Sequence, residues 1–322
     1  MLGMDFFSSD AFLTALARDY YRAKNFEFRT YGLGAHRVRL VEINGKKPAV
    51  SGPFYDYVKP LSSPSPTSRT VGFIPKLVTR TVALDDREPL VSGPISVQDP
   101  APLIIWDRFA TWEDYLSFVK RRSANLLLRK RYLKLVREYG EPDFEFEDRS
   151  AEAFDKCLLW KLNQYEGGHE TLANPRAVAM LRGLFDDGHI IISTLKIGGR
   201  YLSAHACVRE PKRHLSLIPS YDQGFAQYGV GKELLHRMLE HSYRQGDEAF
   251  DFLQGGEPYK WNYATHLQVI EAVGQPSLAH RIKVGSRQLA KDGIVKLSPK
   301  LFLRLKRLVL AARLLTPGDR RA

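Results

Sequence analysis

The side chains of this sequence that could do chemistry are densest around residue 255, where an apolar strand is predicted to end. Phe250 to Leu253 has the pattern of a buried strand, Gly255-Gly256 interrupts it, and Pro258 suits the first turn of a helix. Ligands of α/β proteins usually bind at strand ends, so polar groups in this turn are placed to meet a substrate. The groups are two carboxylates, a phenol and an ammonium, from Asp251, Glu257, Tyr259 and Lys260.

These four groups suit a reaction in which protons move. Asp251 is the first candidate for a base or acceptor-orienting group and Glu257 the second, because a strand-end carboxylate in a partly apolar cleft is expected to have a raised pKa. Tyr259 is the candidate proton donor, and Lys260 is the candidate for binding substrate or phosphate. Structural roles are open too: Asp251 would cap the turn, Tyr259 would pack in the core, and Lys260 would pair with Glu257.

A second polar segment, Tyr221 to Lys232, lies between a predicted strand and a predicted helix. Its small residues let backbone amides approach a ligand, and a helix start carries about half a positive charge, so the segment is predicted to bind a pyrophosphate. Gly-x-Gly is about as often only a tight turn, and neither a Walker loop nor a dinucleotide fingerprint is complete. The predicted cofactor-binding residues are Gln227, Gly229, Val230, Gly231 and Lys232, and the predicted substrate-binding residues are Tyr221, Asp222 and Lys260.

The elements that must position these residues follow from periodicity and helix caps. After residue 150 the expected order is two helices, three strands, a helix and a strand, which predicts an α/β fold with a mixed sheet flanked by helices. The predicted helices are 151–164, 174–185 and 231–245, and the predicted strands are 189–196, 200–208, 214–219 and 249–253.

The part before residue 150 has a less regular pattern. The expected elements are a helix over 10–23 capped by Ser9 or Asp10, strands over 37–43, 71–82 and 103–106, and one helix from Thr111 to Tyr139 that Gly140 ends. Residues 51–67 are rich in Pro, Ser and aromatic residues, which favours an irregular connection over a mobile substrate loop. The helix over 111–139 is strongly basic, and a solvated face is favoured over an anionic ligand there.

The hairpin, third strand, glycine turn, helix and Asp-bearing strand together resemble the GNAT acyltransferase superfamily. The run from Phe250 to Trp261 is more closely similar to a GNAT-like branch, related to FemAB proteins, that is often linked to polysaccharide biosynthesis. The resemblance rests on Tyr221-Asp222, Asp251 and Gly255 to Lys260, and it covers about 111–264. It implies an acyl-CoA-dependent N- or O-acyltransferase that acts on a sugar or lipid-linked glycan in envelope or exopolysaccharide synthesis. Acetyl-CoA is the first candidate for the donor, and N-acetyl transfer is the first candidate for the reaction.

The cofactor turn departs from the family pattern. Many GNAT proteins place Gln or Arg three residues before the first glycine of the turn, whereas here Ala226 holds that place and Gln227 follows. Another acyl donor therefore stays open, including the aminoacyl-tRNA that FemAB-type proteins use. A non-enzymatic module that senses a ligand or serves as a scaffold is a third interpretation.

The resemblance also implies a division of the chain into three parts. Residues 1–110 are expected to form a degenerate GNAT-like lobe, 111–275 the GNAT-like acyltransferase domain, and 276–322 a basic, partly amphipathic helical tail.

Composition and charge fit a soluble globular protein, with 322 residues, 44% hydrophobic and 26% charged. Most of the net charge of +12 lies in the tail, where 12 Lys or Arg face two Asp. A nearly neutral body argues against a duplex-binding surface and for an appended contact with phosphate, anionic lipid or an acidic partner. Residues 298–315 have apolar and basic positions at helical spacing, which suits an anionic membrane surface or docking on the protein itself.

Cysteine and histidine usage indicates no metal site. Cys157 and Cys207 lie singly in apolar patterns, which predicts buried thiols in a reducing compartment. His205 on a predicted strand is expected to be a core residue, and His236 and His241 are five apart, so they do not stack on a helix. No secretory signal or membrane span is recognised, so a cytoplasmic protein is expected, with peripheral contact at the inner membrane face through the tail.

Overall fold

The computed structural model describes residues 5–46, 48–61, 69–84, 100–123, 129–164, 169–255 and 257–276. Its strands in chain order are β1 Phe26–Leu33, β2 His36–Ile43, β3 Pro48–Ala49, β4 Arg69–Thr70, β5 Phe73–Ala83, β6 Ala101–Ile105, β7 Asp143–Asp148, β8 Ile190–Ile197, β9 Arg200–Glu210, β10 Arg213–Tyr221, β11 Ala249–Asp251 and β12 His266–Gly274.

The helices alternate with these strands. They are α1 Asp10–Ala15, which continues as a π-helical turn over Leu16–Tyr20, α2 Trp112–Arg122, α4 Lys130–Tyr139, α5 Ala151–Asn163, α6 Pro175–Asp186, α7 Val230–Arg244 and α8 Pro258–Tyr263. Three short 3-10 helices span Phe6–Ser8, Trp106–Arg108 and Gln223–Tyr228 in the described part of the chain.

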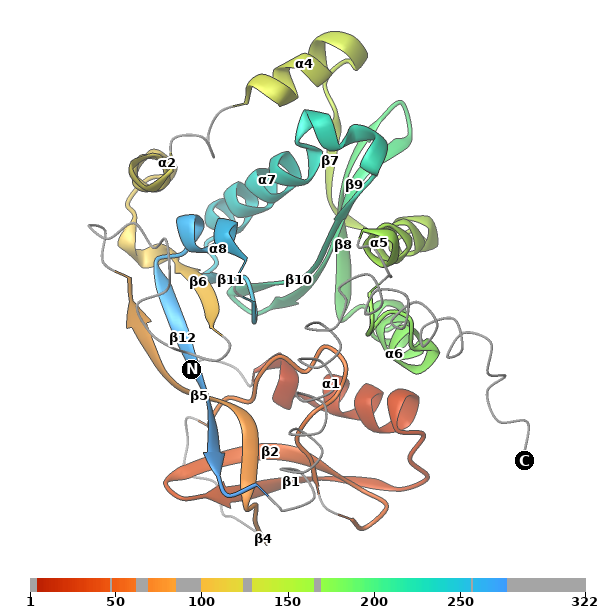
Figure 1. Ribbon diagram of the computed structural model, residues 1–322, viewed down its shortest axis with the longest axis vertical. Coiled ribbons are helices and arrows are strands. Elements are labelled where there is room, and N and C mark those ends of the chain that lie inside the picture. Colours follow the sequence, from red (N-terminus) through yellow and green to blue (C-terminus); the bar gives the residue numbers. More distant parts are fainter. Residues whose placement is uncertain are drawn as a thin grey trace, which may run out of the picture.

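The described strands form two sheets. The larger sheet has eight strands in the order β5-β12-β6-β11-β10-β9-β8-β7, and the smaller has four in the order β3-β2-β1-β4. Figure 1 shows the smaller sheet at one end of the molecule, with the long strands β5 and β12 running from the larger sheet toward it. Among the strand pairs of the larger sheet, β10 and β11 are parallel and the others antiparallel, so the predicted mixed sheet flanked by helices is confirmed.

Helices cover both faces of the larger sheet. α5 and α6 pack on one face of β8, β9 and β10, and α7 packs on the other (Figure 1). Because both faces are covered, β8 reads as a continuous buried run rather than an alternating one. The core under α5 extends to Phe7 and Tyr57 of the N-terminal part, whereas the core under α7 contains Trp106 and Phe250. Full burial of each such aromatic contributes about 1.5–3 kcal/mol.

Several helix starts predicted from capping residues are confirmed. Ser9 Oγ accepts the N–H of Phe12 at 3.2 Å, Thr111 and Asp114 form a reciprocal capping box, and the side chain of Asn174 caps α6. Such a cap stabilises a helix by about 1 kcal/mol. The predicted helices and strands after residue 150 lie within two residues of the observed ones.

The single helix predicted over 111–139 is wrong. α2 ends at Arg122, because Ser123 takes an extended conformation with φ of −158° and ψ of 93°, and α4 begins at Lys130. The basic residues on both sides share one helical periodicity, so the pattern did not reveal the break. Five of the strands in the described part of the chain were not predicted: β1, β3, β4, β7 and β12.

The domain boundaries at residues 110 and 275 stay predictions. The larger sheet includes β5 and β6, which precede residue 110: Ile104 pairs with Phe250, and Pro102 pairs with Leu267. The predicted amphipathic helix over 298–315 lies outside the described residues, as do residues 62–67 of the Pro- and Ser-rich segment.

Candidate active site

β10 and β11 begin side by side and then separate. They pair in parallel only where Arg213 to Leu215 meets Ala249 to Asp251. β11 ends there, whereas β10 continues to Tyr221 with β9 as its described partner. The end of β11 and the following turn are therefore set apart from the second half of β10, which is the kind of opening where α/β sheets bind ligands.

The turn after β11 is shaped by Asp251 and by two residues of positive φ. Asp251 Oδ1 accepts the N–H of Leu253 at 2.7 Å and so caps the turn. Leu253 has a φ of 57°, and Gly255 has a φ of 141°. A leucine in the left-handed region costs roughly 1–3 kcal/mol and persists only where its surroundings hold it, which is common at functional sites.

Asp251 lies at the centre of a buried ion-pair network, with a side chain that is 0% exposed. Its Oδ2 accepts hydrogen bonds from the Arg213 guanidinium, from the Tyr57 hydroxyl at 2.9 Å and from Gln268 Nε2 at 2.6 Å. Arg213 has two further carboxylate partners at 3.3 and 3.5 Å, Asp5 and Glu210. The network joins β10, β11 and β12 to the N-terminal part of the chain.

The expected raised pKa of Asp251 is wrong. Burial alone would raise the pKa of Asp251, but the charges of Arg213 and Lys59 outweigh burial and hold it below its ordinary value of 3.8. An ion-paired carboxylate closed off from solvent is a poor proton acceptor. The geometry therefore favours a positioning role for Asp251 over the predicted role of base.

Lys260 and Glu257 form an ion pair at the start of α8. Lys260 Nζ lies 2.9 Å from Glu257 Oε2 and donates to the carbonyl oxygen of Gln254 at 3.2 Å. The Lys260 side chain is 7% exposed, whereas that of Glu257 is 53% exposed. Burial alone would raise the pKa of Glu257, but Lys260 outweighs it and holds the pKa below its ordinary value. Glu257 is thus an ionised carboxylate that solvent reaches.

Gly255 leaves the space that this ion pair occupies. A Cβ at Gly255 would come within 2.4 Å of Glu257 Oε2 and 2.7 Å of Lys260 Nζ. We expect Gly255→Ala to lower the free energy of unfolding by about 1–3 kcal/mol, because a side chain is also strained at this φ. Urea denaturation checks this against Gly72→Ala, where a Cβ meets open space. Equal stability of the two variants would contradict it.

Gln254 brings together groups from distant parts of the chain. Its N–H donates to Asp56 Oδ2 at 3.3 Å, its side-chain oxygen accepts from Lys76 Nζ at 2.5 Å, and its carbonyl accepts from Lys260. Lys161 of α5 lies close by: burial lowers its pKa, and Glu257 and Lys260 act on that pKa in opposite directions. We call these residues the Gln254 cluster: Asp56, Lys76, Lys161, Gln254, Glu257 and Lys260.

Sequence reasoning missed Asp56, which lies in the irregular segment 51–61. Burial raises the pKa of Asp56 to about 6, while Lys76 and Lys260 act to lower it. A carboxyl group that titrates near neutral pH suits a general base. The local signal is an acid between two aromatic residues, Tyr55 and Tyr57, which reveals neither its burial nor its partners.

The predicted cofactor turn opens α7. Gly229, with a φ of 70°, is the N-terminal cap, and no side chain caps this helix end. Val230 is 0% exposed, backbone included, whereas its neighbours Gly229 and Gly231 are half-buried. Gly231 lies against the Tyr221 ring, where a Cβ would come within 2.9 Å of Cδ1, and Gln227 is exposed on the preceding 3-10 helix. The Tyr221 ring therefore packs against the turn, and its predicted substrate-binding role stays a prediction.

Asp222 also has a structural role. Its Oδ1 accepts the N–H of Gly224 at 2.9 Å, and its Oδ2 lies 3.2 Å from Arg200. These contacts start the 3-10 helix that leads to α7. The predicted substrate-binding role of Asp222 stays a prediction.

Cations surround the start of α7. Arg129 makes a two-pronged ion pair with Glu233, at 3.1 and 2.6 Å. Burial lowers the pKa of Lys232, which Glu233 raises and Arg131 lowers further. An uncapped helix start beside Lys232, Arg129 and Arg131 suits a phosphate group.

His236 lies one turn further along α7 and contacts α8. Its Nε2 is 2.5 Å from the Tyr263 hydroxyl. Burial, Lys232 and Arg129 lower the pKa of His236 to about 4, so the imidazole is neutral near pH 7. Tyr259, the predicted proton donor, is half-buried on the same short helix with its ring 6.4 Å from that of Phe252.

His205 is a satisfied core residue, as its strand position predicts. It is 3% exposed, and its Nε2 lies 2.8 Å from Ser216 Oγ. Burial, His214, and the charges of Lys161 and Lys260 lower the pKa of His205 to about 3. A neutral His205 therefore lies beside the Gln254 cluster without adding charge.

Most of the predicted site residues thus fall into two groups, one at the start of α7 and one at the start of α8. Gly229, Gly231 and Lys232 open α7, which the Tyr263–His236 contact joins to α8. Glu257 and Lys260 belong to the Gln254 cluster, and Asp251 lies buried beneath them in its ion-pair network.

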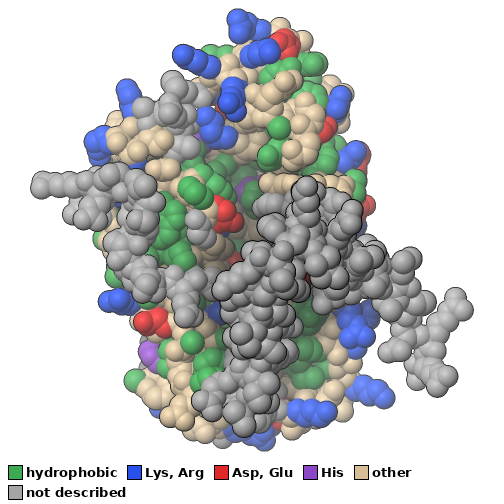
Figure 2. All heavy atoms as spheres, in the orientation of Figure 1, with side chains coloured by type: hydrophobic (Ala, Val, Ile, Leu, Met, Phe, Trp, Pro, Cys, Tyr) green, Lys and Arg blue, Asp and Glu red, His purple; other side chains and the backbone are tan. Residues whose placement is uncertain are grey.

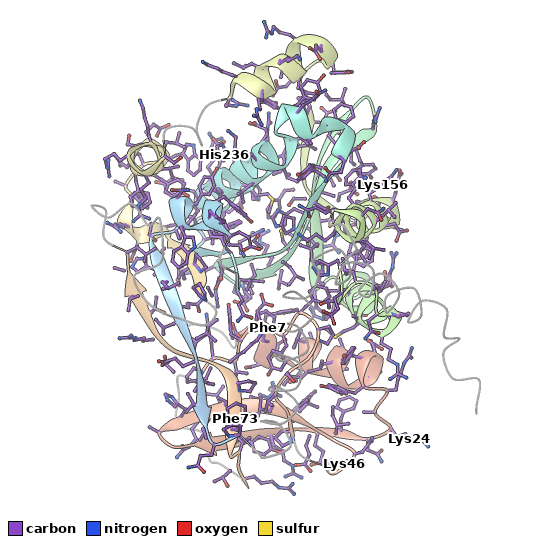
Figure 3. The ribbon with its side chains drawn as sticks, in the orientation of Figure 1. Phe7, Lys24, Lys46, Phe73, Lys156 and His236 are labelled. Atoms are coloured by element: carbon purple, nitrogen blue, oxygen red, sulfur yellow. The ribbon has the colours of Figure 1, made fainter. Side chains whose placement is uncertain are left out.

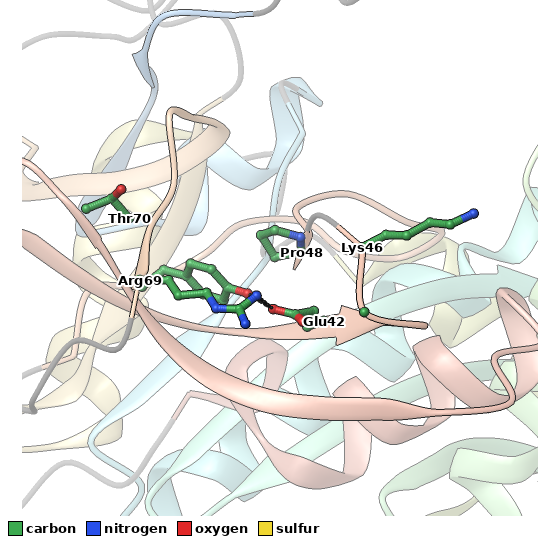
Figure 4. A pocket seen from close by; sticks show the side chains of 7 residues that line it. Glu42, Lys46, Pro48, Arg69 and Thr70 are labelled. Atoms are coloured by element: carbon green, nitrogen blue, oxygen red, sulfur yellow. Dashed lines mark hydrogen bonds and ion pairs between the residues drawn. The ribbon is translucent and has the colours of Figure 1, made fainter.

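A separate pocket lies on the smaller sheet, away from these residues (Figure 4). It encloses about 530 Å³. Its acidic group, Glu42, accepts a hydrogen bond from Tyr31 at 2.8 Å and pairs with Arg69 at 2.6 Å. The carboxylate is thus already neutralised, and none of the predicted site residues lines this pocket.

Both cysteines are free and buried, as predicted. Burial raises the pKa of the Cys157 thiol to about 11. We expect neither thiol to react with a disulfide reagent until the protein unfolds, because the thiolate is the reactive form. Titration with such a reagent, with and without urea, checks this; rapid reaction of the native protein would contradict it. In the described part of the chain no three His, Cys, Asp or Glu side chains are grouped to hold a metal ion.

Part of the chain matches a known protein family, and its fold is similar to that of solved structures. Residues 127–261 match the family described as "Acetyltransferase (GNAT) domain", so the chain contains a GNAT-like domain. The structure is similar to that of L-PGS from Bacillus licheniformis, with 12% identity, a TM-score of 0.45, and 92% of this chain and 99% of that chain covered. It is also similar to FemX, with 9% identity, a TM-score of 0.45, and 84% and 90% covered. No curated protein sequence matches the chain.

Proposed function

We propose that this protein is a GNAT-type acyltransferase that moves an acyl group from acyl-CoA to an amine or hydroxyl. Acetyl-CoA is the first candidate for the donor. The observation that carries the proposal is the uncapped start of α7 with Lys232, inside the family match and beside the opening between β10 and β11. Backbone amides of this helix start, together with Lys232, would bind the pyrophosphate of the donor.

Acyl transfer needs a base for the acceptor, donors for the developing oxyanion, and a proton for the leaving thiolate. Tyr259 stays the proposed proton donor, since it is half-buried on α8 next to Lys260. Glu257 and Lys260 would orient the acceptor. Asp251 as the base stays a prediction that Asp251→Asn tests; we favour a role in which it holds the turn.

The acceptor class is proposed from the resemblance of the run Phe250 to Trp261. It is a sugar or a lipid-linked glycan intermediate in envelope or exopolysaccharide synthesis. No helix among the described residues is long and apolar enough to cross a membrane. We propose a cytoplasmic protein whose basic tail contacts the anionic inner membrane face.

The first experiment measures the melting temperature of the purified protein with acetyl-CoA, longer acyl-CoAs and free CoA. A ligand at about 100 times its dissociation constant stabilises by roughly 2.7 kcal/mol, which raises the melting temperature by several degrees. Lys232→Met should remove most of the shift, whereas Lys134→Met, an exposed residue of α4, should keep it. No shift with any CoA species would reject the CoA-dependent function, and binding without turnover with any acceptor would favour a sensor or scaffold.

The second candidate donor is aminoacyl-tRNA, which a basic surface near the start of α7 favours. Exposed cations end α2 and line α4, at the end of the molecule where Figure 2 shows Lys and Arg side chains together. They are Lys120, Arg121, Lys130, Arg131, Lys134 and Arg137. The logarithm of the tRNA binding constant should fall linearly with the logarithm of the salt concentration, and tRNA binding should survive removal of the tail. Charge reversal of Lys130 and Lys134 should weaken it; an unchanged affinity would reject this candidate.

A further inference from the structure

Gln254 is held on three sides yet keeps a polar group without a protein partner. Its N–H, its side-chain oxygen and its carbonyl are bonded to Asp56, Lys76 and Lys260. Its Nε2 is buried and has no hydrogen-bond acceptor. A buried donor without an acceptor costs about 1–3 kcal/mol, so a ligand oxygen at this position would recover that free energy.

The same place concentrates ammonium groups. Lys260 Nζ is bonded to Glu257 and Gln254, and Lys76 Nζ is bonded to Gln254 from β5. Lys161 Nζ, on α5, donates to Gln164 Oε1 at 3.1 Å and lies near enough to Glu257 and Lys260 for their charges to act on its pKa. The cluster thus contains three ammonium groups and two carboxylates.

Like charges brought together out of water repel one another, and an anionic ligand relieves the repulsion. Lysine binds phosphate as a point charge, and an amide N–H adds direction. Neutral His205 beside the cluster neither competes with the lysines nor repels an anion. The donor set therefore fits an anion with several acceptor oxygens.

We propose that the Gln254 cluster is the acceptor subsite and binds a phosphate group that the acceptor carries next to its nucleophile. Gln254 Nε2, Lys161 and Lys260 bind the phosphate oxygens. Asp56, which shares Gln254 with them, faces the nucleophile. The reaction at this subsite rests on the proposed transfer function, whereas the binding of phosphate there does not.

In the proposed transfer step, Asp56 accepts a proton and Tyr259 donates one. The acceptor nitrogen or oxygen attacks the acyl carbon, and its proton passes to the Asp56 carboxylate as the new bond forms. The bond from the acyl carbon to the donor sulfur breaks, and the thiolate leaves with a proton from Tyr259. Asp56 returns its proton to solvent, and Tyr259 regains one from solvent.

Binding can be tested without knowing the natural acceptor. The probes are 2-aminoethyl phosphate, β-alanine and ethanolamine. All three carry an amine; the first also carries a phosphate, the second a carboxylate, and the third only a neutral hydroxyl. Melting temperature is measured against probe concentration at constant ionic strength. We expect 2-aminoethyl phosphate to raise it most, and ethanolamine to leave it unchanged. An equal shift with all three probes, or none with 2-aminoethyl phosphate, would overturn the proposal.

Variants locate the bound phosphate. Lys161→Met should weaken the binding of 2-aminoethyl phosphate by roughly tenfold or more, since a charge-assisted hydrogen bond is lost. Lys156→Met, an α5 residue on the outer side of the molecule in Figure 3, should leave it unchanged. Equal affinity in the Lys161 and Lys156 variants would overturn the proposal.

Lys232→Met separates this subsite from the proposed donor site. Phosphate binding that is lost in Lys232→Met and kept in Lys161→Met lies at α7 and overturns the subsite. Phosphate binding that depends on Lys161 while no CoA species binds supports the subsite and rejects the CoA-dependent function. The two proposals therefore fail separately.

Discussion

Replacing Arg213 by methionine is expected to lower the free energy of unfolding by about 3–5 kcal/mol. The Arg213 side chain is 12% exposed and is the ion-pair partner of three carboxylates, those of Asp5, Glu210 and Asp251. Methionine keeps most of the length but removes the charge, so Asp251 stays buried without the guanidinium that it binds. Urea denaturation followed by tryptophan fluorescence measures the loss.

The neighbouring residue provides the control. Lys212 pairs with Glu248 at 3.1 Å, but these side chains are 69% and 51% exposed. Lys212→Met should therefore cost about 1 kcal/mol or less. If Arg213→Met cost no more than Lys212→Met, the buried network would not hold the two parts of the chain together.

The pH dependence of this loss has a defined sign. The folded pKa of Asp251 lies below its ordinary value of 3.8, so its ion pair stabilises fully above about pH 4 and is lost as pH falls through the folded pKa. Burial raises the pKa of Glu210 to about 7, so protonating Glu210 below that pH acts in the opposite direction. The Asp251 contribution is therefore read from the decline below about pH 4.

Asp56→Asn is expected to reduce the rate of acyl transfer by about 10²- to 10⁴-fold, the usual loss when a general base is removed. The amide keeps the shape of the carboxyl group but cannot accept the proton. In the wild-type protein, kcat/KM should fall as pH drops below about 6, because protonation of Asp56 removes the base. Steady-state kinetics with the acceptor found by screening measures both effects.

Stability separates this role from a structural one. The folded pKa of Asp56, about 6, lies above the ordinary 3.8, so folding favours the protonated form and Asp56 costs stability as pH rises through 6. Asparagine resembles the protonated form, so the variant should be at least as stable as the wild type above pH 7. A matched control is Asp155→Asn, whose side chain is 65% exposed. A large loss of stability with unchanged kcat would make Asp56 structural.

Much of the fold could be predicted because it depends on interactions between residues that are close in the sequence. The capping residues Ser9, Thr111 and Asn174 and the glycine pair 198-199 act on neighbours in the chain, so their effect shows in sequence. Strand β12 could not be predicted in its place between β5 and β6, because that place depends on partners that lie far away in the sequence, such as Leu103 for His266 and Phe73 for Gly274.

The sequence by itself determined the order of elements from α5 to β11, the glycine turn that opens α7, and the cluster of polar residues after β11. Only the tertiary structure decided how these residues ionise. Arg213 and Gln268 converge on Asp251 and bury it as a charged pair, whereas Asp56, from an irregular segment, meets Gln254 and the lysines. A pKa depends on desolvation and on charges within a few ångströms, and folding alone brings those charges together.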